Sequence, residues 1–213
     1  MTKIIYQKFD KKAITDLPQI VFPGRICVVL SESEAEKAVN FLLSRKIVGV
    51  DTETRPAFKK GQMHQVALLQ VSTEDICFLF RLNHIGMPPA VLRLLTNKEV
   101  PMVGLSWHDD LCALRRRAEF EPGLFIDIQD MVGQIGIEDL SLQKIYANIF
   151  HQKISKRQQL SNWNADVLTD KQKLYAATDA WACLNLYKAI SELQQTGDYT
   201  LVCNEEQTEK VTI

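Results

Sequence analysis

Carboxylates and a phenol at regular spacing are the side chains of this sequence best suited to chemistry. Asp51 and Glu53 follow the apolar run at residues 46–50, which is typical of a buried strand, and a strand projects residues two apart to the same side. Tyr175 and Asp179 are four apart in a predicted helix, so they share one face. Because Mg²⁺ and Mn²⁺ prefer oxygen ligands, the carboxylates predict a metal site.

The chemistry that such a site supports is hydrolysis of a phosphodiester. Two divalent cations about 3.5–4 Å apart activate a water, stabilise charge on the phosphate and neutralise the leaving oxygen. The Tyr175 phenol, one turn from Asp179, could orient the attacking water. Each motif alone has a commoner explanation, because acidic residues often end strands at the surface and helical tyrosines usually pack in a core. The chemistry therefore depends on a fold that brings both motifs together.

A fourth carboxylate is expected from two adjacent acids, Asp109 and Asp110, near the start of a helix predicted over residues 107–118. Trp107 and Leu111 belong to the apolar stripe of that helix. At about 100° per residue, Asp110 flanks the stripe, whereas Asp109 points nearly opposite Leu111. Asp110 is therefore the predicted acid of the site.

The elements that must position these residues are strands followed by alternating strands and helices. Strands are predicted at residues 26–30, 46–54, 65–72, 76–82, 102–105 and 124–128, and helices at 33–43, 90–95, 107–118, 140–150 and 170–195. The short turn at residues 73–75 predicts an antiparallel hairpin, and Thr169 and Gln172 form a capping box before the last helix, which Gly197 ends. This order predicts an α/β fold with a mixed five- or six-stranded sheet and helices on both faces.

The composition is that of an ordinary globular protein, with 213 residues, 46% hydrophobic and 24% charged. We expect an N-terminal arm at residues 1–24, one domain at 25–196 and a C-terminal tail at 197–213 that frays after Asp198. The sequence has neither an apolar run long enough for a membrane span nor a signal-peptide pattern, which predicts a cytoplasmic protein with no membrane partner. Its five scattered cysteines predict reduced, buried thiols.

A net charge of −1 argues against coating nucleic acid by bulk charge, since that requires many phosphate-neutralising cations. Local basic patches would have to provide such contacts, although a basic run is more often a solvated face. The candidate patches are Lys59 with Lys60, residues 115–117, and the group of Lys153, Lys156 and Arg157.

Taken in order, three motifs resemble the tyrosine-containing DEDD family of 3′-5′ exonucleases. They are Asp51-x-Glu53, the run Val-Gly-Leu-Ser-Trp-His-Asp-Asp at residues 103–110, and Tyr175-x-x-x-Asp179. Within the family, the chain is most similar to the exonuclease domain of the Werner syndrome protein, and ribonuclease D is a more distant relative. The resemblance covers about residues 25–192.

The resemblance implies a ribonuclease H-like fold and two divalent cations, Mg²⁺ or Mn²⁺. Asp51, Glu53 and Asp179 would gather one cation and Asp51 would help to hold the second. Asp110 would act mostly through metal-bound waters, and Tyr175 would orient the nucleophilic water. The reaction would release nucleoside 5′-monophosphates from the 3′ end of a nucleic acid. We expect DNA, rather than RNA, as the substrate.

Five further residues are candidate contacts to the nucleic acid. They are Thr52, Met63, Lys153, Lys156 and Arg157. Met63 belongs to the segment at residues 55–64, which could lie over the terminal nucleotides. The three basic residues lie in the polar linker before the last helix, where the resemblance implies backbone contacts without readout of bases.

Two alternative functions stay open at this point. One is ribonuclease D-like processing of RNA 3′ ends, because nothing in the sequence reads a 2′-hydroxyl. The other is a nucleic-acid-binding module that keeps the fold without chemistry, although all the expected acids are present. Protein partners are not indicated.

Overall fold

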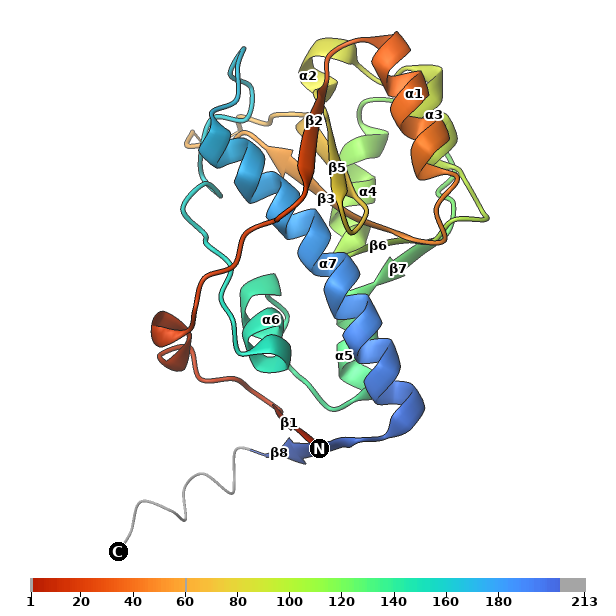
Figure 1. Cartoon of the computed structure of the whole chain (residues 1–213). Helices are drawn as coiled ribbons and strands as arrows, with labels where there is room; N and C mark the ends of the chain where they lie inside the picture. The colour runs from red at the N-terminus through yellow and green to blue at the C-terminus, as the bar shows by residue number, and fades with distance from the viewer. Residues whose placement is uncertain (1, 60, 204–213) are drawn as a thin grey trace, which may run out of the picture.

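A six-stranded mixed sheet forms the centre of the computed structural model, which describes residues 2–59 and 61–203 (Figure 1). Its strands are β2 (Arg25–Val29), β3 (Val48–Thr54), β4 (Val66–Ser72), β5 (Ile76–Phe80), β6 (Met102–Gly104) and β7 (Phe125–Asp127), in the order β2-β5-β4-β3-β6-β7. The antiparallel meander β3-β4-β5 contains the predicted hairpin, and the other neighbouring strands are parallel. Lys60 and the tail beyond residue 203 lie outside the described residues.

Helices cover both faces of this sheet, which confirms the predicted fold class. They are α1 (Glu32–Leu42), α2 (Leu82–Ile85), α3 (Pro89–Leu95), α4 (Trp107–Arg115), α5 (Ile128–Gln134), α6 (Leu142–Phe150) and α7 (Asp170–Thr196). One core contains α1, α3 and α4, and the opposite face packs against α5, α6 and α7. The short helices α2 and α5 were not predicted. The predicted capping box of Thr169 and Gln172 begins α7, and Gly197, in the left-handed conformation, ends it.

Small residues allow α7 to pack closely on β3. A Cβ added at Gly49 would lie 2.1 Å from the carbonyl oxygen of Ala180 and 2.9 Å from Cβ of Leu184. Ala176 and Ala177, one turn earlier in α7, are fully buried. Because β3 continues from Gly49 to its acidic end, this packing sets the first half of α7 over those acids.

A second, two-stranded sheet joins the two ends of the described chain. Strand β1 (Lys3–Tyr6) pairs in parallel with β8 (Tyr199–Val202), and a 3-10 turn, η1 (Ala13–Asp16), follows β1. The prediction that the chain frays after Asp198 is therefore wrong for Tyr199–Val202. Each strand has only four residues, and the two lie at opposite ends of the described chain. A local sequence pattern therefore does not predict them. The division into arm, domain and tail stays a prediction.

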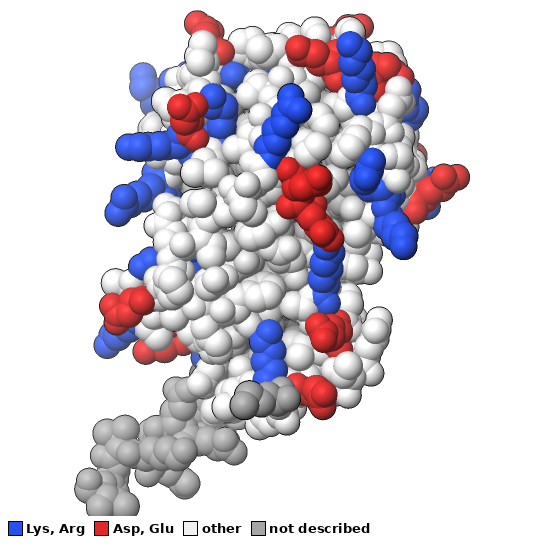
Figure 2. Space-filling view, in the orientation of Figure 1, with Lys and Arg blue, Asp and Glu red and all other residues white. Residues whose placement is uncertain are grey.

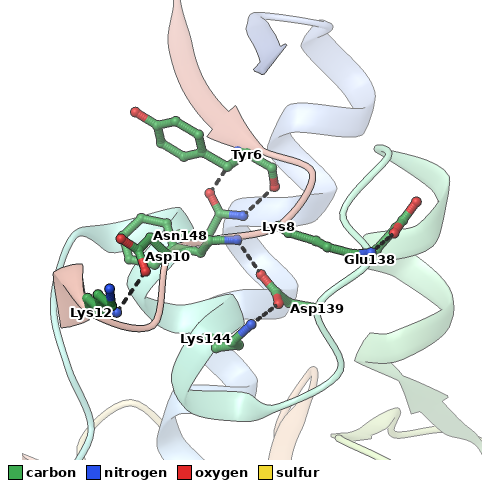
Figure 3. Close-up of polar contacts among 9 residues, drawn as sticks. Tyr6, Lys8, Asp10, Lys12, Glu138, Asp139, Lys144 and Asn148 are labelled. Atoms are coloured by element: carbon green, nitrogen blue, oxygen red, sulfur yellow. Dashed lines mark hydrogen bonds and ion pairs between the residues drawn. The ribbon is translucent and has the colours of Figure 1, made fainter. Parts of the chain in front are cut away.

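Side chains of α6 and of the loop before it hold the arm (Figure 3). The buried Asn148 side chain accepts from the Tyr6 N–H at 2.9 Å and donates to the Tyr6 carbonyl at 2.7 Å. The buried Asp139 accepts from the Phe9 N–H and from Lys144 Nζ, both at 2.7 Å. The two Asn148 bonds and the charge-assisted bond from Phe9 to Asp139 fix the first residues of the arm against α6 and the loop before it.

All five cysteines are free, in agreement with the predicted reduced state. Their predicted burial is wrong for Cys112 and Cys203, which are exposed. Within residues 2–59 and 61–203, no helix is both long and apolar enough to cross a membrane. The cytoplasmic location stays a prediction.

Candidate active site

Three carboxylates from β3 and α7 meet at one place. Asp51 and Glu53 face α7 from the end of β3, where their cross-strand neighbours in β4 are Gln70 and Leu68. Helix α7 sets Asp179 beside them, and one oxygen from each of the three carboxylates lies within 4.8 Å of the others. Residues more than 120 positions apart are thus brought together, as a metal site requires.

Burial and mutual repulsion make this group costly to ionise. Glu53 and Asp179 are 8% and 6% exposed. Burial, followed by repulsion from Asp179 and Asp110, raises the pKa of Asp51 well above its usual range. Burial, followed by repulsion from Asp51, raises the pKa of Glu53 to about 10. Burial also raises the pKa of Asp179 to about 7, against the opposing hydrogen bond from Tyr175. Without a cation, the group therefore retains protons near neutral pH.

The donor set fits a hard divalent cation. Asp179 Oδ1 is buried and has no hydrogen-bond partner among the described residues, which is costly for a carboxylate oxygen. Carboxylate oxygens are the ligands that Mg²⁺ and Mn²⁺ prefer, and a cation bound there would relieve both the repulsion and the missing contact. Asp51, Glu53 and Asp179 are the residues that could hold it.

Tyr175 lies one turn before Asp179 on α7, and its phenol helps to lower the pKa of that carboxyl. Its ring packs against the fully buried Trp163, with centroids 6.0 Å apart. Burial, followed by repulsion from Asp179 and Glu53, raises the pKa of the Tyr175 phenol. The phenol therefore stays protonated at physiological pH, so it can orient a water but cannot act as a base.

Asp110 approaches β3 from the opposite face of the sheet. Thr52 points away from its neighbours Asp51 and Glu53, and its hydroxyl donates to Asp110 Oδ1. Burial raises the pKa of Asp110 to about 6, although this hydrogen bond opposes the change. Asp109 is exposed. Asp110 is thus next to the three-carboxylate group without belonging to it, and its role in catalysis stays a prediction.

An open pocket of about 300 Å³ gives access to these residues. Asp51, Glu53, Tyr175 and Asp179 line it, and the exposed Lys156 lies at its edge. The positive charge of Lys156 acts on Asp179, since it helps to lower the pKa of that carboxyl. The pocket therefore joins a group of acids to a cation that can meet a phosphate.

The family model for 3′-5′ exonucleases matches residues 26–194. The chain belongs to the 3′-5′ exonuclease family. It is 31% identical over 203 residues to the mouse bifunctional 3′-5′ exonuclease and ATP-dependent helicase WRN, a match that covers 88% of this chain and 14% of that longer protein. It is 27% identical over 193 residues to ribonuclease D of Haemophilus influenzae, which covers 88% of this chain and 47% of the relative. These matches confirm the resemblance to the exonuclease domain of the Werner syndrome protein and to ribonuclease D.

A solved structure has the same fold as this exonuclease. The structure of Escherichia coli RNase D, described as an exoribonuclease involved in structured RNA processing, superposes with a TM-score of 0.72. The two share 18% sequence identity, and the match covers 81% of this chain and 46% of that one. At this identity the likeness concerns the fold.

Two residues of the exonuclease that support the site were not singled out in the sequence. Gln70, fully buried opposite Asp51 in the β3–β4 ladder, donates Nε2 to Asp51 Oδ2 at 3.4 Å. The hairpin register could have identified it, since cross-strand neighbours share a face. Asp127, at the end of β7, is the other.

Asp127 joins the starts of two helices. Its carboxylate accepts from the N–H groups of Ser106 at 3.0 Å and Trp107 at 2.8 Å, and from Gln129 at 2.9 Å. Ser106 has a left-handed backbone, with φ 59°, so the turn into α4 needs this support. An acid preceding a helix is an N-cap signal for α5, but its contact with α4 depends on the tertiary fold.

The five predicted nucleic-acid contacts of the exonuclease lie in different surroundings. Thr52 is bonded to Asp110, and Met63 is 68% exposed in the segment after β3. Lys153 Nζ donates to the carbonyl of Thr15, so this charge holds the arm. The other two basic residues, Lys156 and Arg157, are exposed. All five contacts stay predictions.

The visible surface has no uniformly basic face. Figure 2 shows Lys and Arg side chains interspersed with Asp and Glu, and several basic side chains project along the edge where the segment between α6 and α7 lies. This distribution agrees with a net charge of −1 and with local, rather than bulk, attraction of phosphates.

Proposed function

We propose that this exonuclease removes nucleotides from the 3′ end of DNA by a two-metal mechanism and releases nucleoside 5′-monophosphates. The observation that carries the proposal is the convergence of Asp51, Glu53 and Asp179, with one oxygen of each within 4.8 Å of the others. Glu53 and Asp179 are buried and one oxygen of Asp179 has no partner among the described residues, so a cation bound there would be stabilising. An open pocket beside them supplies room for the end of a strand.

The ligands of one cation follow from the same geometry, whereas the second cation and the role of Asp110 follow from the resemblance to the DEDD family. Asp51, Glu53 and Asp179 would hold one Mg²⁺ or Mn²⁺, Asp51 would help to hold a second, and Asp110 would act through water. The bound cations would activate the attacking water and neutralise charge on the phosphate and the leaving oxygen. Gln70 fixes the Asp51 carboxylate through its Nε2 hydrogen bond.

Two residues of the pocket position the reactants. The protonated Tyr175 phenol, held one turn from Asp179, orients the attacking water. Lys156, exposed at the pocket edge, contacts the phosphate backbone of the strand. Because such contacts carry no base information, shortening can proceed through any sequence.

DNA is the proposed substrate because the relatives of this chain include a DNA polymerase I, from Aquifex aeolicus, which is 27% identical over 165 residues. RNA is the second candidate, since the lining of the pocket also includes neutral hydrogen-bonding side chains suited to a 2′-hydroxyl, namely Ser141, Gln143, Ser155 and Gln159. The E. coli structure described as an exoribonuclease shares the fold.

Competition between matched DNA and RNA oligonucleotides tests the substrate. Both are labelled at the 5′ end, mixed in equal amounts and incubated with Mg²⁺ or Mn²⁺, and the released products are identified by mass spectrometry. A higher kcat/KM for DNA, with nucleoside 5′-monophosphates as products, is expected. Faster shortening of RNA would transfer the proposal to RNA. Salt-sensitive binding without any cleavage would favour the non-catalytic module.

A further inference from the structure

A second pocket of about 210 Å³ adjoins the open pocket beside Asp51, Glu53 and Asp179, which we call the catalytic pocket. Ile154, Ser155 and Tyr175 line both pockets, so the two meet at the Tyr175 side chain. In α7, the catalytic pocket uses the face of Asp179 and Cys183, whereas the second pocket uses the neighbouring face. A nucleic-acid strand whose 3′ end lies at Asp51, Glu53 and Asp179 can therefore place an adjacent nucleotide in the second pocket.

The lining of this pocket suits a flat apolar group attached to a phosphate. Ile20, Val21 and Leu174 provide apolar walls, and the cations Arg157 and Lys171 are both exposed. Among the described residues that line the pocket, none is acidic. Pockets for drug-sized ligands hold about 300–1,000 Å³, so a volume of about 210 Å³ suits a single nucleobase.

The N-terminal arm makes one wall of the pocket and is held there by main-chain bonds. The Ile20 N–H donates to the Lys153 carbonyl at 3.0 Å, and the Lys153 N–H donates to the Pro18 carbonyl at 2.9 Å. The Phe22 N–H donates to Thr178 Oγ1 at 3.0 Å, directly before Asp179. Figure 1 shows the arm crossing beside the segment that follows α6. Hydrogen bonds thus tie the wall both to α7 and to the segment that follows α6.

This wall lies outside the part of the chain that the family model covers. The model begins at residue 26, whereas the arm contributes residues 19–21. The far end of the arm is anchored separately, through Asn148 and Asp139 (Figure 3). The pocket therefore combines residues inside the matched range with residues of the arm that precede it.

We propose that this pocket binds the base of the nucleotide on the 5′ side of the scissile phosphate. Ile20 and Val21 contact the base, and Arg157 and Lys171 contact its backbone phosphates. This inference rests on the proposed exonuclease function. The arm then contributes to affinity for the strand, which a catalytic domain without it would lack.

An abasic substrate tests the pocket without altering the protein. A DNA strand whose penultimate nucleotide lacks its base should have a KM about tenfold higher than the intact strand, because one buried base contact is lost. An unchanged KM would overturn the proposal, and it is the result expected if the pocket holds the released nucleotide instead. If the wild type fails to shorten the intact strand, the proposed function itself is wrong.

Filling the pocket supplies the matching change in the protein. Val21→Trp should raise the KM for the intact strand about tenfold, yet add nothing further for the abasic strand, because both changes remove the same contact. Ile4→Trp, at an exposed position of β1 outside the pocket, is the control and should leave both KM values unchanged. Independent, multiplicative effects of Val21→Trp and the missing base would contradict a shared site.

Discussion

Gly49 of β3 touches Ala180 of α7 so closely that no side chain fits between them. A Cβ at Gly49 would lie 2.1 Å from the carbonyl oxygen of Ala180, which directly follows Asp179. The contact fixes the height of α7 above the sheet two residues before Asp51. The spacing of the carboxylates is therefore set by backbone packing at a residue that has no side chain.

Gly49→Ala should weaken both the fold and the site. The added methyl meets main-chain atoms, so α7 must shift, at a cost of about 1–3 kcal/mol in the free energy of unfolding. Turnover should fall as well, because Asp179 moves away from Asp51. Urea unfolding and kcat measure the two effects. Gly133→Ala in α5, where a Cβ would meet no atom within 4 Å, should be neutral or stabilising. Equal stability of both variants would refute the packing argument.

The stability of the metal-free protein should depend on pH through the carboxylate group. The folded pKa values of Asp110, about 6, and Asp179, about 7, lie above the ordinary value of 3.8. Between these values the folded state binds more protons than the unfolded state, so stability falls as pH rises. The expected slope is about 1.4 kcal/mol per pH unit for each group in its window.

Melting temperatures of wild type and Asp179→Asn, measured without metal from pH 4 to pH 8, separate this effect from other titrations. Asp179→Asn should become the more stable of the two as the pH rises, and Mg²⁺ should raise the melting temperature of the wild type far more than that of the variant. Asp109→Asn, at an exposed position, should follow the wild type. If the melting temperatures of wild type and Asp179→Asn change in parallel with pH, ionisation of the carboxylate group does not lower the stability of the folded protein.

Tyr175→Phe should slow the chemical step while metal binding is retained. The variant keeps the ring that packs on Trp163 but loses the hydroxyl, so kcat should fall about 10²-fold. Mg²⁺ affinity, measured by calorimetry, should change little because the carboxylates remain. Tyr187→Phe, later on the same helix, is a matched control that should keep the wild-type kcat. A wild-type kcat for Tyr175→Phe would exclude the water-orienting role.

Asp127→Ala should act on the site from a distance. It removes the acceptor for three N–H groups at the starts of α4 and α5, which should cost about 1–2 kcal/mol of stability. Because α4 carries Asp110, kcat should fall too. Asp130→Ala, an exposed acid in the first turn of α5, serves as the control in thermal unfolding and kinetics. If both variants behave alike, Asp127 has no special positioning role.

Much of the fold could be predicted because its signals are local. The turn at residues 73–75 predicts the hairpin, and the capping box at Thr169 predicts the start of α7. Helical phase directs Asp110 rather than Asp109 toward the sheet, where it contacts Thr52. Such features depend on a few neighbouring residues, so they can be predicted without knowing the tertiary contacts.

The remainder depends on contacts between distant residues. The β1–β8 pair joins the two ends of the described chain, and each strand is too short to show alternation. Lys153 belongs to a basic cluster in the sequence, but its Nζ donates a hydrogen bond to the carbonyl of Thr15. Its neighbour Lys156 remains exposed beside the pocket. A one-dimensional pattern of charge does not distinguish these two positions.

The most direct test of the site is the Mg²⁺ dependence of strand shortening by wild type, Asp179→Asn and Asp109→Asn. On DNA labelled at its 5′ end, the wild type should produce a ladder of shorter strands only when Mg²⁺ or Mn²⁺ is present. Asp179→Asn should lose about 10³-fold in rate, since a buried ligand is replaced by a neutral isostere, and Asp109→Asn should match the wild type. Shortening by folded Asp179→Asn at the wild-type rate would contradict a catalytic centre built on Asp51, Glu53 and Asp179.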